Sequence, residues 1–346
     1  SSDSTERVIE LWASQNLPDW QKKGKGTAPR ILAAKLAKGQ DIESVNAYII
    51  KLKPWSQTGS SWPLHPNGDY DFTLTILTGI LYMFGDKPEI LYPDTRSHLL
   101  NVLLTEEGYS KRLYAPMTFG LVSETENHIL MTQGSCYLKN RWMALHGNTD
   151  EKYHNLKNGM EDLICDRLGK LENSGLYEFN SIPYLAYTMT ALLNLDAYGS
   201  EKVSDSAKAI LDRINWNYAV SSMSFKRYVP FRRRLEKAEN TSLRYDYQNI
   251  FAKTWMSLYP GSKYECGNKE MQSSHSLWPS LMPYRPADKV AEWIVKKPAD
   301  YFIRIGHGAN SCPEIYSGGA GLPVDSRRYK SRPKIGNRRK AGHTDA

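Results

Sequence analysis

The stretch LKNGMEDLICDRLGKL, residues 156–171, decides the fold class of this chain. Its apolar residues recur every three or four positions, at Leu156, Met160, Leu163, Ile164, Leu168 and Leu171. This spacing places them on one face of an α-helix, with charged residues on the opposite face. We therefore predict an amphipathic helix that packs against neighbouring helices.

The same periodicity recurs along most of the chain and predicts an all-α protein. Further helical patterns lie at residues 31–36, 72–84, 90–104, 129–143, 184–195 and 203–214. Turn signals such as Tyr198-Gly199-Ser200 separate them, so consecutive helices should alternate in direction as hairpins. We expect an (α/α) toroid, an incomplete barrel of helical hairpins with its long loops at one mouth. An irregular helical bundle is the alternative.

The character of the sequence changes near residue 300. Residues 1–300 carry the helical patterns and form the predicted catalytic domain, whereas residues 301–346 are rich in Gly, Pro and basic residues and are expected to be poorly ordered at their end. The net charge of the chain is +8, and eight Lys or Arg but only two Asp follow residue 324. Most of the net charge therefore belongs to a tail of a kind that is more often solvated than engaged with a polyanion.

The composition, with 40% hydrophobic and 24% charged residues, predicts a globular protein with a substantial core. No apolar stretch approaches the roughly 20 residues that span a bilayer, and no signal-peptide pattern opens the chain. The four cysteines have no zinc-ligand spacing, and we expect neither a metal nor a cofactor. Cys136 and Cys165 are expected to be buried thiols, whereas Cys266 and Cys312 lie in loops that would allow a disulfide.

The segment SETENHILM, residues 123–131, is the most informative for function. Polar residues meet the start of a predicted helix there, and Ser123 or Thr125 can cap it. Asn127 and His128 then lie in the first turn, where backbone donors and the helix dipole favour an anion such as a substrate carboxylate. For His128, an ordinary hydrogen-bonded helix histidine is the alternative.

A second polar and aromatic segment, residues 175–187, runs into a predicted helix at Pro183. Tyr184 is the candidate proton-transferring residue, because a tyrosine near its working pKa can move protons. Tyr187 lies one turn along the same face and is a rival or a substrate-binding residue. Asn180 can orient a substrate or simply satisfy the loop, and both tyrosines can instead be packing residues.

Two further segments supply candidate substrate-binding residues. Arg232, Arg233 and Arg234 follow an aromatic run, and guanidinium groups bind carboxylates in a bidentate manner. A solvated surface run is the alternative for these arginines.

Near the amino end, Trp62, His65 and Asp69 precede another predicted helix, in a mixture of residue types that suits a sugar subsite. The alternative is that Asp69 or Asp71 serves as a helix cap. Both interpretations place these residues at the entrance to the same helix.

The run ETENH at residues 124–128, together with residues 180–187 and 67–72, resembles helical-toroid polysaccharide lyases, of which alginate and glucuronan lyases are the most similar. The resemblance covers residues 60–240 as an ordered set of motifs. Such enzymes cleave a uronic-acid polymer by β-elimination, with Asn, His, Tyr and often Arg around the uronate.

The resemblance implies a role for each matching residue. Asn127 would neutralise the substrate carboxylate, His128 would act as neutraliser or base, and Tyr184 as acid or as acid and base. Arg232 to Arg234 would assist binding. Many toroidal lyases continue into a β-sandwich, and the last part of this chain is too short and too basic for one.

Two other functions are compatible with the sequence. A glycoside hydrolase would pair Asp69 or Asp71 with Glu124 or Glu126, about 6.5–9.5 Å apart in an inverting enzyme. A non-enzymatic polyanion-binding protein would use the basic tail and the arginine run, and would lose affinity as salt rises. We favour the lyase, with an acidic polysaccharide as partner rather than nucleic acid and a secreted or periplasmic location; the oligomeric state is left open.

Overall fold

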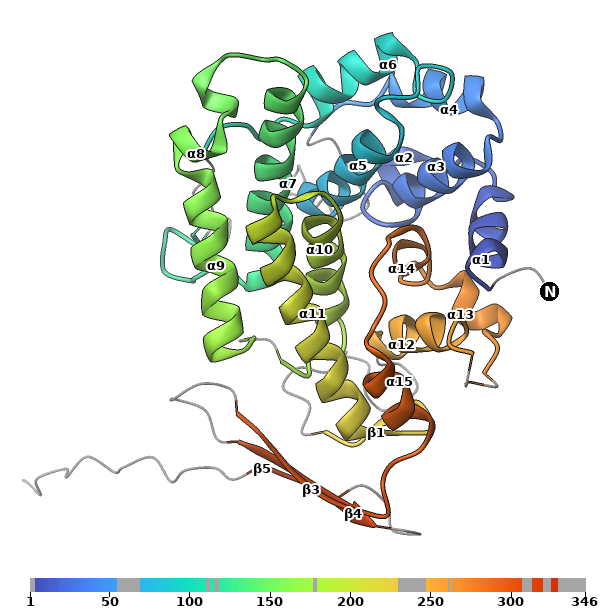
Figure 1. Ribbon diagram of the computed structural model, residues 1–346. Helices are drawn as coiled ribbons and strands as arrows, with labels where there is room; N and C mark the ends of the chain where they lie inside the picture. Colours follow the sequence, from blue (N-terminus) through green and yellow to red (C-terminus); the bar gives the residue numbers. More distant parts are fainter. Residues whose placement is uncertain are drawn as a thin grey trace, which may run out of the picture.

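The computed structural model describes residues 4–54, 69–109, 113–114, 118–176, 179–229, 247–260, 262, 264–306, 313–319 and 325–328. Over these residues the chain is mostly helical, as the sequence predicted (Figure 1). The α-helices are α1 Ser4–Ala13, α2 Trp20–Lys23, α3 Thr27–Lys38, α4 Ile42–Ile49, α5 Tyr70–Phe84, α6 Pro93–His98, α7 Glu126–Leu145, α8 Asn155–Asn158, α9 Met160–Ser174, α10 Leu185–Tyr198, α11 Glu201–Ser221, α12 Gln248–Met256, α13 Asn268–Gln272, α14 Leu277–Leu281 and α15 Asp288–Val295. A π-helical turn (Leu99–Leu103), a 3-10 turn (Glu151–Tyr153) and the strands β1 Ser222–Met223, β2 Lys226–Arg227, β3 Asp300–Ile305, β4 Glu314–Gly319 and β5 Asp325–Arg328 complete the described chain.

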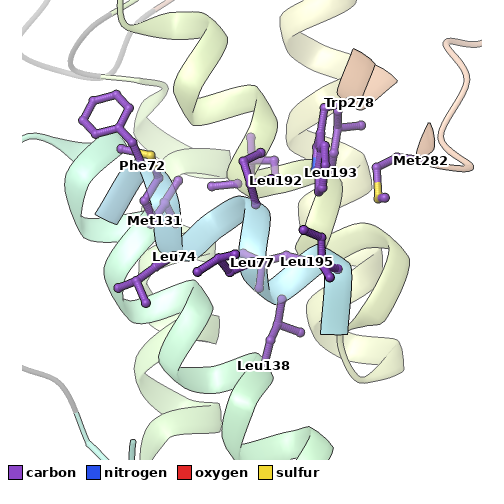
Figure 2. Packing of buried hydrophobic residues seen from close by; sticks show 14 of the residues in the cluster. Phe72, Leu74, Leu77, Met131, Leu138, Leu192, Leu193, Leu195, Trp278 and Met282 are labelled. Atoms are coloured by element: carbon purple, nitrogen blue, oxygen red, sulfur yellow. The ribbon is translucent and has the colours of Figure 1, made fainter. Parts of the chain in front are cut away.

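Helix α5 runs through the centre of the core and is buried along nearly its whole length. Apart from Asp71 and three threonines its sequence is apolar on all sides, which is typical of a helix surrounded by other helices. Figure 2 shows side chains of α7 and α10 packing around it, with Trp278 of α14 at its other end. The amino end of α5, where Phe72 lies, is thereby fixed against α7 and α10.

Helices α7, α9, α10 and α11 stand side by side and alternate in direction (Figure 1). Helix α7 packs on α10 and α9 packs on α11, so α7 and α10 form one layer and α9 and α11 form a second layer beside it. The hairpin turns follow local chemistry. Gly159, with φ 84°, ends α8 before α9, and the side chain of Ser200 caps α11 by accepting from the backbone of Val203.

The two helical patterns that differ from expectation do so for local reasons. The pattern beginning at Leu156 is interrupted at Gly159, so Leu156 falls in the short helix α8 and is 84% exposed. The pattern at residues 90–104 forms α6 and the π-helical turn instead of one continuous helix, because Pro93 sets the start of α6.

A small antiparallel sheet, in the order β3-β4-β5, covers residues that were expected to be an irregular tail. Asp300 pairs with Gly319, and Ile305 pairs with Glu314. Residues 300–328 therefore contain regular structure, and residues 329–346 lie outside the described part of the chain. The strands escaped prediction because their short alternation is diluted by Gly and charged residues.

The structure shows the state of three of the four cysteines and tests whether any described helix could span a membrane. Cys136 is buried as predicted, and Cys165 is partly exposed. Cys266 is a buried free thiol whose Sγ lies 3.5 Å from the carbonyl of Lys253, so it does not form the disulfide that the sequence allowed, and Cys312 lies outside the described residues. In the described chain, every helix is too short or too polar to cross a lipid bilayer.

Candidate functional site

The amino-terminal turns of α5, α7 and α10 meet, and they carry the residues that the sequence singled out. His128 in the first turn of α7 contacts Asp71 and Phe72 in the first turn of α5. The Phe72 ring in turn packs edge-on against Tyr187 of α10, with ring centroids 4.5 Å apart. Backbone N–H groups at helix starts carry partial positive charge, so this junction favours negatively charged ligands.

Asp71 and His128 form a close pair within this junction. Nδ1 of His128 lies 2.5 Å from Oδ2 of Asp71; the Asp71 side chain is fully buried, and that of His128 is 18% exposed. A carboxylate only accepts hydrogen bonds, so Nδ1 carries the hydrogen and donates it to Asp71. Nε2 then holds the lone pair, which is the tautomer that a histidine base needs.

Asn127, beside His128, is 1% exposed and has one end of its amide engaged. The hydroxyl of Thr125 donates to Oδ1 of Asn127 at 2.6 Å, instead of capping the helix as the sequence suggested. Within the described chain, Nδ2 of Asn127 has no hydrogen-bond partner. A buried donor without an acceptor costs about 1–3 kcal/mol, a cost that an oxygen-bearing ligand would remove.

Tyr187 is held in a group of aromatic rings. Besides Phe72, it contacts His275 edge-on at a centroid distance of 5.1 Å, and His275 packs against Tyr247, which directly precedes α12. Burial raises the pKa of the Tyr187 phenol, while the nearby positive charge of Arg30 pulls this pKa down. The phenol therefore keeps its proton at neutral pH.

Tyr184 lies at the start of the same helix as the residue directly before α10. It is partly exposed and close enough to Tyr187 that its negative form would raise the pKa of Tyr187. The two tyrosines thus share one region, as the sequence predicted. Of the two, Tyr187 is the one with direct ring contact to Phe72 and with a place in the neighbouring pocket.

A pocket with a volume of about 190 Å³ opens beside this junction. Its wall includes Lys22, Lys23, Lys25, Arg30, Tyr187 and Ser274. The ammonium group of Lys25 lies 4.3 Å from the centre of the Phe72 ring, a cation–π contact that joins the pocket to the His128 side of the site. The pocket is strongly basic.

Arg30 and His275 are the buried ionisable groups next to this pocket. Arg30, in the first turn of α3, is 2% exposed, and burial lowers its pKa to about 10. Burial and then the charge of Arg30 lower the pKa of His275 to about 3, so this imidazole is neutral at physiological pH. Neither group appeared among the residues that the sequence singled out.

Two predicted binding residues are engaged with protein groups. Asp69 directly precedes α5 and accepts from Lys25 at 2.7 Å, without making a cap hydrogen bond. Asn180 is buried away from solvent; its Oδ1 accepts from Arg227 at 3.1 Å and its Nδ2 donates to Glu314 at 2.5 Å. Asn180 thus ties the sheet to the helical body.

The remaining predicted binding residues lie outside the described residues: Trp62, His65, Arg232, Arg233 and Arg234. The structure instead brings forward Lys22, Lys23, Lys25 and Arg30. The signal for these residues was the run KKGKGTAPR at positions 22–30, where four cations precede or begin a helix. A sequence alone cannot tell such a run from an ordinary solvated surface.

No protein-family model matches the chain, and comparisons with curated proteins and with solved structures gave no match. The site must therefore be interpreted from its own chemistry. Within the described residues, His, Cys, Asp and Glu side chains do not gather in threes as they would around a metal ion.

Proposed function

We propose that the chain is a polysaccharide lyase that cleaves a uronic-acid polymer, of the alginate or glucuronan type, by β-elimination. The observation that carries the proposal is the Asp71–His128 pair, 2.5 Å apart, next to a protonated tyrosine and a basic pocket. β-Elimination needs a base, an acid and positive potential for a carboxylate. One junction of helix ends supplies all three.

In this proposal His128 is the base. Its hydrogen bond to Asp71 holds the proton on Nδ1, so that Nε2 can take the C5 proton of the uronate. Asp71 also stabilises the imidazolium that forms, since the carboxylate faces the ring directly. Asp71 is a positioning residue, because it acts through His128.

We assign the acid to Tyr187 in place of Tyr184. Burial keeps the Tyr187 phenol protonated, and a neutral phenol can donate to the departing O4. Tyr187 also touches the Phe72 ring that His128 touches, so both proton-transfer groups contact one side chain. A sugar seated over Phe72 would have access to both.

The substrate carboxylate is neutralised by donors on α7. Nδ2 of Asn127, which lacks a partner among the described residues, and the amino-terminal turn of α7 favour the negative charge that spreads onto the carboxylate when C5 loses its proton. This charge is largest in the transition state, so the donors accelerate the reaction instead of merely binding the polymer.

The proposed elimination moves one proton to His128 and one proton from Tyr187. His128 takes the C5 proton, the C5–H electron pair forms the C4–C5 double bond, and the C4–O4 bond breaks. O4 takes the proton of Tyr187. Solvent then removes the proton from the His128 imidazolium and supplies one to the Tyr187 phenolate. The products are a shortened chain and a fragment with an unsaturated sugar at its non-reducing end.

The arrangement of helices is compatible with the toroid that such lyases use. Helices α7 and α10 pack together beside α5, α9 and α11 form a second layer against them, and the amino ends of α3, α5, α7, α10 and α12 all border the junction. We propose that α3, α5, α7 and α10 belong to the inner layer of an incomplete (α/α) toroid, whose inner helix ends surround the substrate.

The test is to incubate the protein with glucuronan and with alginate and to follow the ultraviolet absorbance of the new conjugated double bond. We expect absorbance to rise with the native chain and not with His128→Gln, which keeps a donor for Asp71 but has no base. Reducing ends without absorbance would indicate a hydrolase and would contradict the proposal. The hydrolase is less well supported, because Asp69 and Asp71 are engaged by Lys25 and His128.

A further inference from the structure

Arg30 is a buried cation with no buried anion beside it in the described part of the chain. Its side chain is 2% exposed, and among the described residues no carboxylate forms an ion pair with it. Nη1 donates to the carbonyl of Gly26 at 2.9 Å, and Nε has no hydrogen-bond partner in the described chain. Burying a guanidinium in this way is costly unless a negative group completes the site.

The residues around Arg30 add to the positive charge of the pocket. Lys22 and Lys23 are exposed at the rim of the pocket; Lys25 pairs with Asp69 at 2.7 Å, and Lys22 forms a looser, exposed pair with Asp19 at 3.9 Å. His275, the buried imidazole on the other side, is neutral and so supplies no negative charge. Arg30 also lies in the first turn of the twelve-residue helix α3, where the backbone potential is positive.

The pocket adjoins the proposed reaction centre and shares Tyr187 with it. Tyr187 lines the pocket and also contacts the Phe72 ring, and the same Phe72 ring contacts His128. An anion at Arg30 and a uronate at His128 would therefore occupy different positions, connected through the contacting rings of Tyr187 and Phe72. A continuous sugar chain can supply both groups only if neighbouring residues are acidic.

We propose that the Arg30 pocket binds the carboxylate of the sugar residue adjoining the one that reacts at His128. This inference rests on the proposed function. The planar guanidinium suits a carboxylate held by two parallel hydrogen bonds, and Lys22 and Lys23 add attraction at the rim. The consequence is a preference for polymers in which every residue is a uronate over polymers in which uronates alternate with neutral sugars.

The test measures binding apart from cleavage. Saturated oligomers of glucuronan, acidic at every residue, and of hyaluronan, acidic at every second residue, are titrated calorimetrically into the full chain carrying His128→Gln. We expect the glucuronan oligomer to bind more tightly. Adding Arg30→Met should weaken glucuronan binding by about 10- to 100-fold and leave hyaluronan binding nearly unchanged.

Two pairs of surface substitutions test the pocket without changing the buried Arg30. Lys22→Gln with Lys23→Gln should weaken glucuronan binding by a smaller factor, whereas the matched pair Lys202→Gln with Lys208→Gln, on the exposed face of α11, should not. Equal affinities for the two oligomers, or equal losses in the rim and the matched pairs, would overturn the inference. Glucuronan binding that depends on Arg30 in a native chain that never produces the double bond would retain a carboxylate pocket and reject the lyase.

Discussion

Nδ1 of His128 donates to Oδ2 of Asp71 across 2.5 Å, although 57 residues separate the two in sequence. The bond fixes the tautomer of His128, which is the only histidine among the described residues with a ring contact to Phe72. We expect Asp71→Asn to lower kcat by roughly 10²- to 10⁴-fold with little change in KM, because an amide N–H facing Nδ1 would move the imidazole proton to Nε2. Steady-state kinetics on glucuronan measure both constants.

The chain contains its own control for this substitution. Asp86 and His146 form a second pair, 2.8 Å apart, that is exposed to solvent at the far end of α7. Asp86→Asn should leave both constants unchanged. If the two variants behaved alike, the Asp71 carboxylate would have no part in positioning the base.

The two tyrosines of the junction should differ in the effect of removing the hydroxyl. Tyr187→Phe keeps the ring contacts with Phe72 and His275 but removes the proposed acid, so turnover should fall by about 10²-fold or more. Because burial raises the pKa of Tyr187, the native enzyme should show no loss from this group until the pH exceeds about 10. The pH dependence of turnover measures this limit. A large effect of Tyr184→Phe with none of Tyr187→Phe would give the role to Tyr184.

Most helices could be predicted from the sequence because their apolar periodicity is a local property. The pattern at residues 156–171 becomes α9, and Gly159 alone accounts for the separation of Leu156 from it. The sheet at residues 300–328 was missed because Gly and charged residues dilute the alternation of its short strands, and because it is held by a buried contact between Glu314 and the distant Asn180. That contact also gives Asn180 a structural task that its loop position did not suggest.

The site was predictable where it depends on one segment and not where it depends on several. The sequence placed Asn127 and His128 in the first turn of a helix, and they lie there in α7. From the sequence, Asp71 was predicted only as a helix cap or as a hydrolase acid. The contact between Asp71 and His128 arises from the packing of α5 on α7. Burial of Arg30 is equally a property of the fold, so the sequence alone does not distinguish Arg30 from the lysines around it.

His275 should make the protein less stable in acid. Its pKa of about 3 in the folded chain lies below the value of about 6.5 expected when unfolded, so its contribution to stability is present above pH 6.5 and is lost as the pH falls towards 3. Between pH 7 and pH 4.5 this one group should account for roughly 2–3 kcal/mol of the loss in unfolding free energy. Urea unfolding at both pH values should show that loss reduced by a similar amount in His275→Gln. The exposed His146→Gln serves as control, and an unchanged acid loss in His275→Gln would contradict the argument.

Gly79 and Trp278 should be closely coupled in stability. The Trp278 ring packs directly on α5 at Gly79, where an added Cβ would lie 2.2 Å from Cζ2 of the indole. The ring cannot easily move away, because its Nε1 donates to Asn194 at 2.8 Å and the amide of Asn194 donates to the carbonyl of Thr75 on α5. Gly79→Ala should therefore destabilise the fold by about 1–3 kcal/mol, measured as the free energy of unfolding in urea.

The matched substitution on α9 should have the opposite sign. Gly169 is also inside a helix, and in the described chain nothing lies within 4 Å of a Cβ built there. Gly169→Ala should stabilise the protein by about 0.5–1 kcal/mol, because alanine loses less backbone entropy in a helix. The two glycines have the same helical setting and differ in what faces them. If both alanine variants were stabilised, the indole would have room to shift, and the packing of α14 on α5 would be looser than the Asn194 bridge implies.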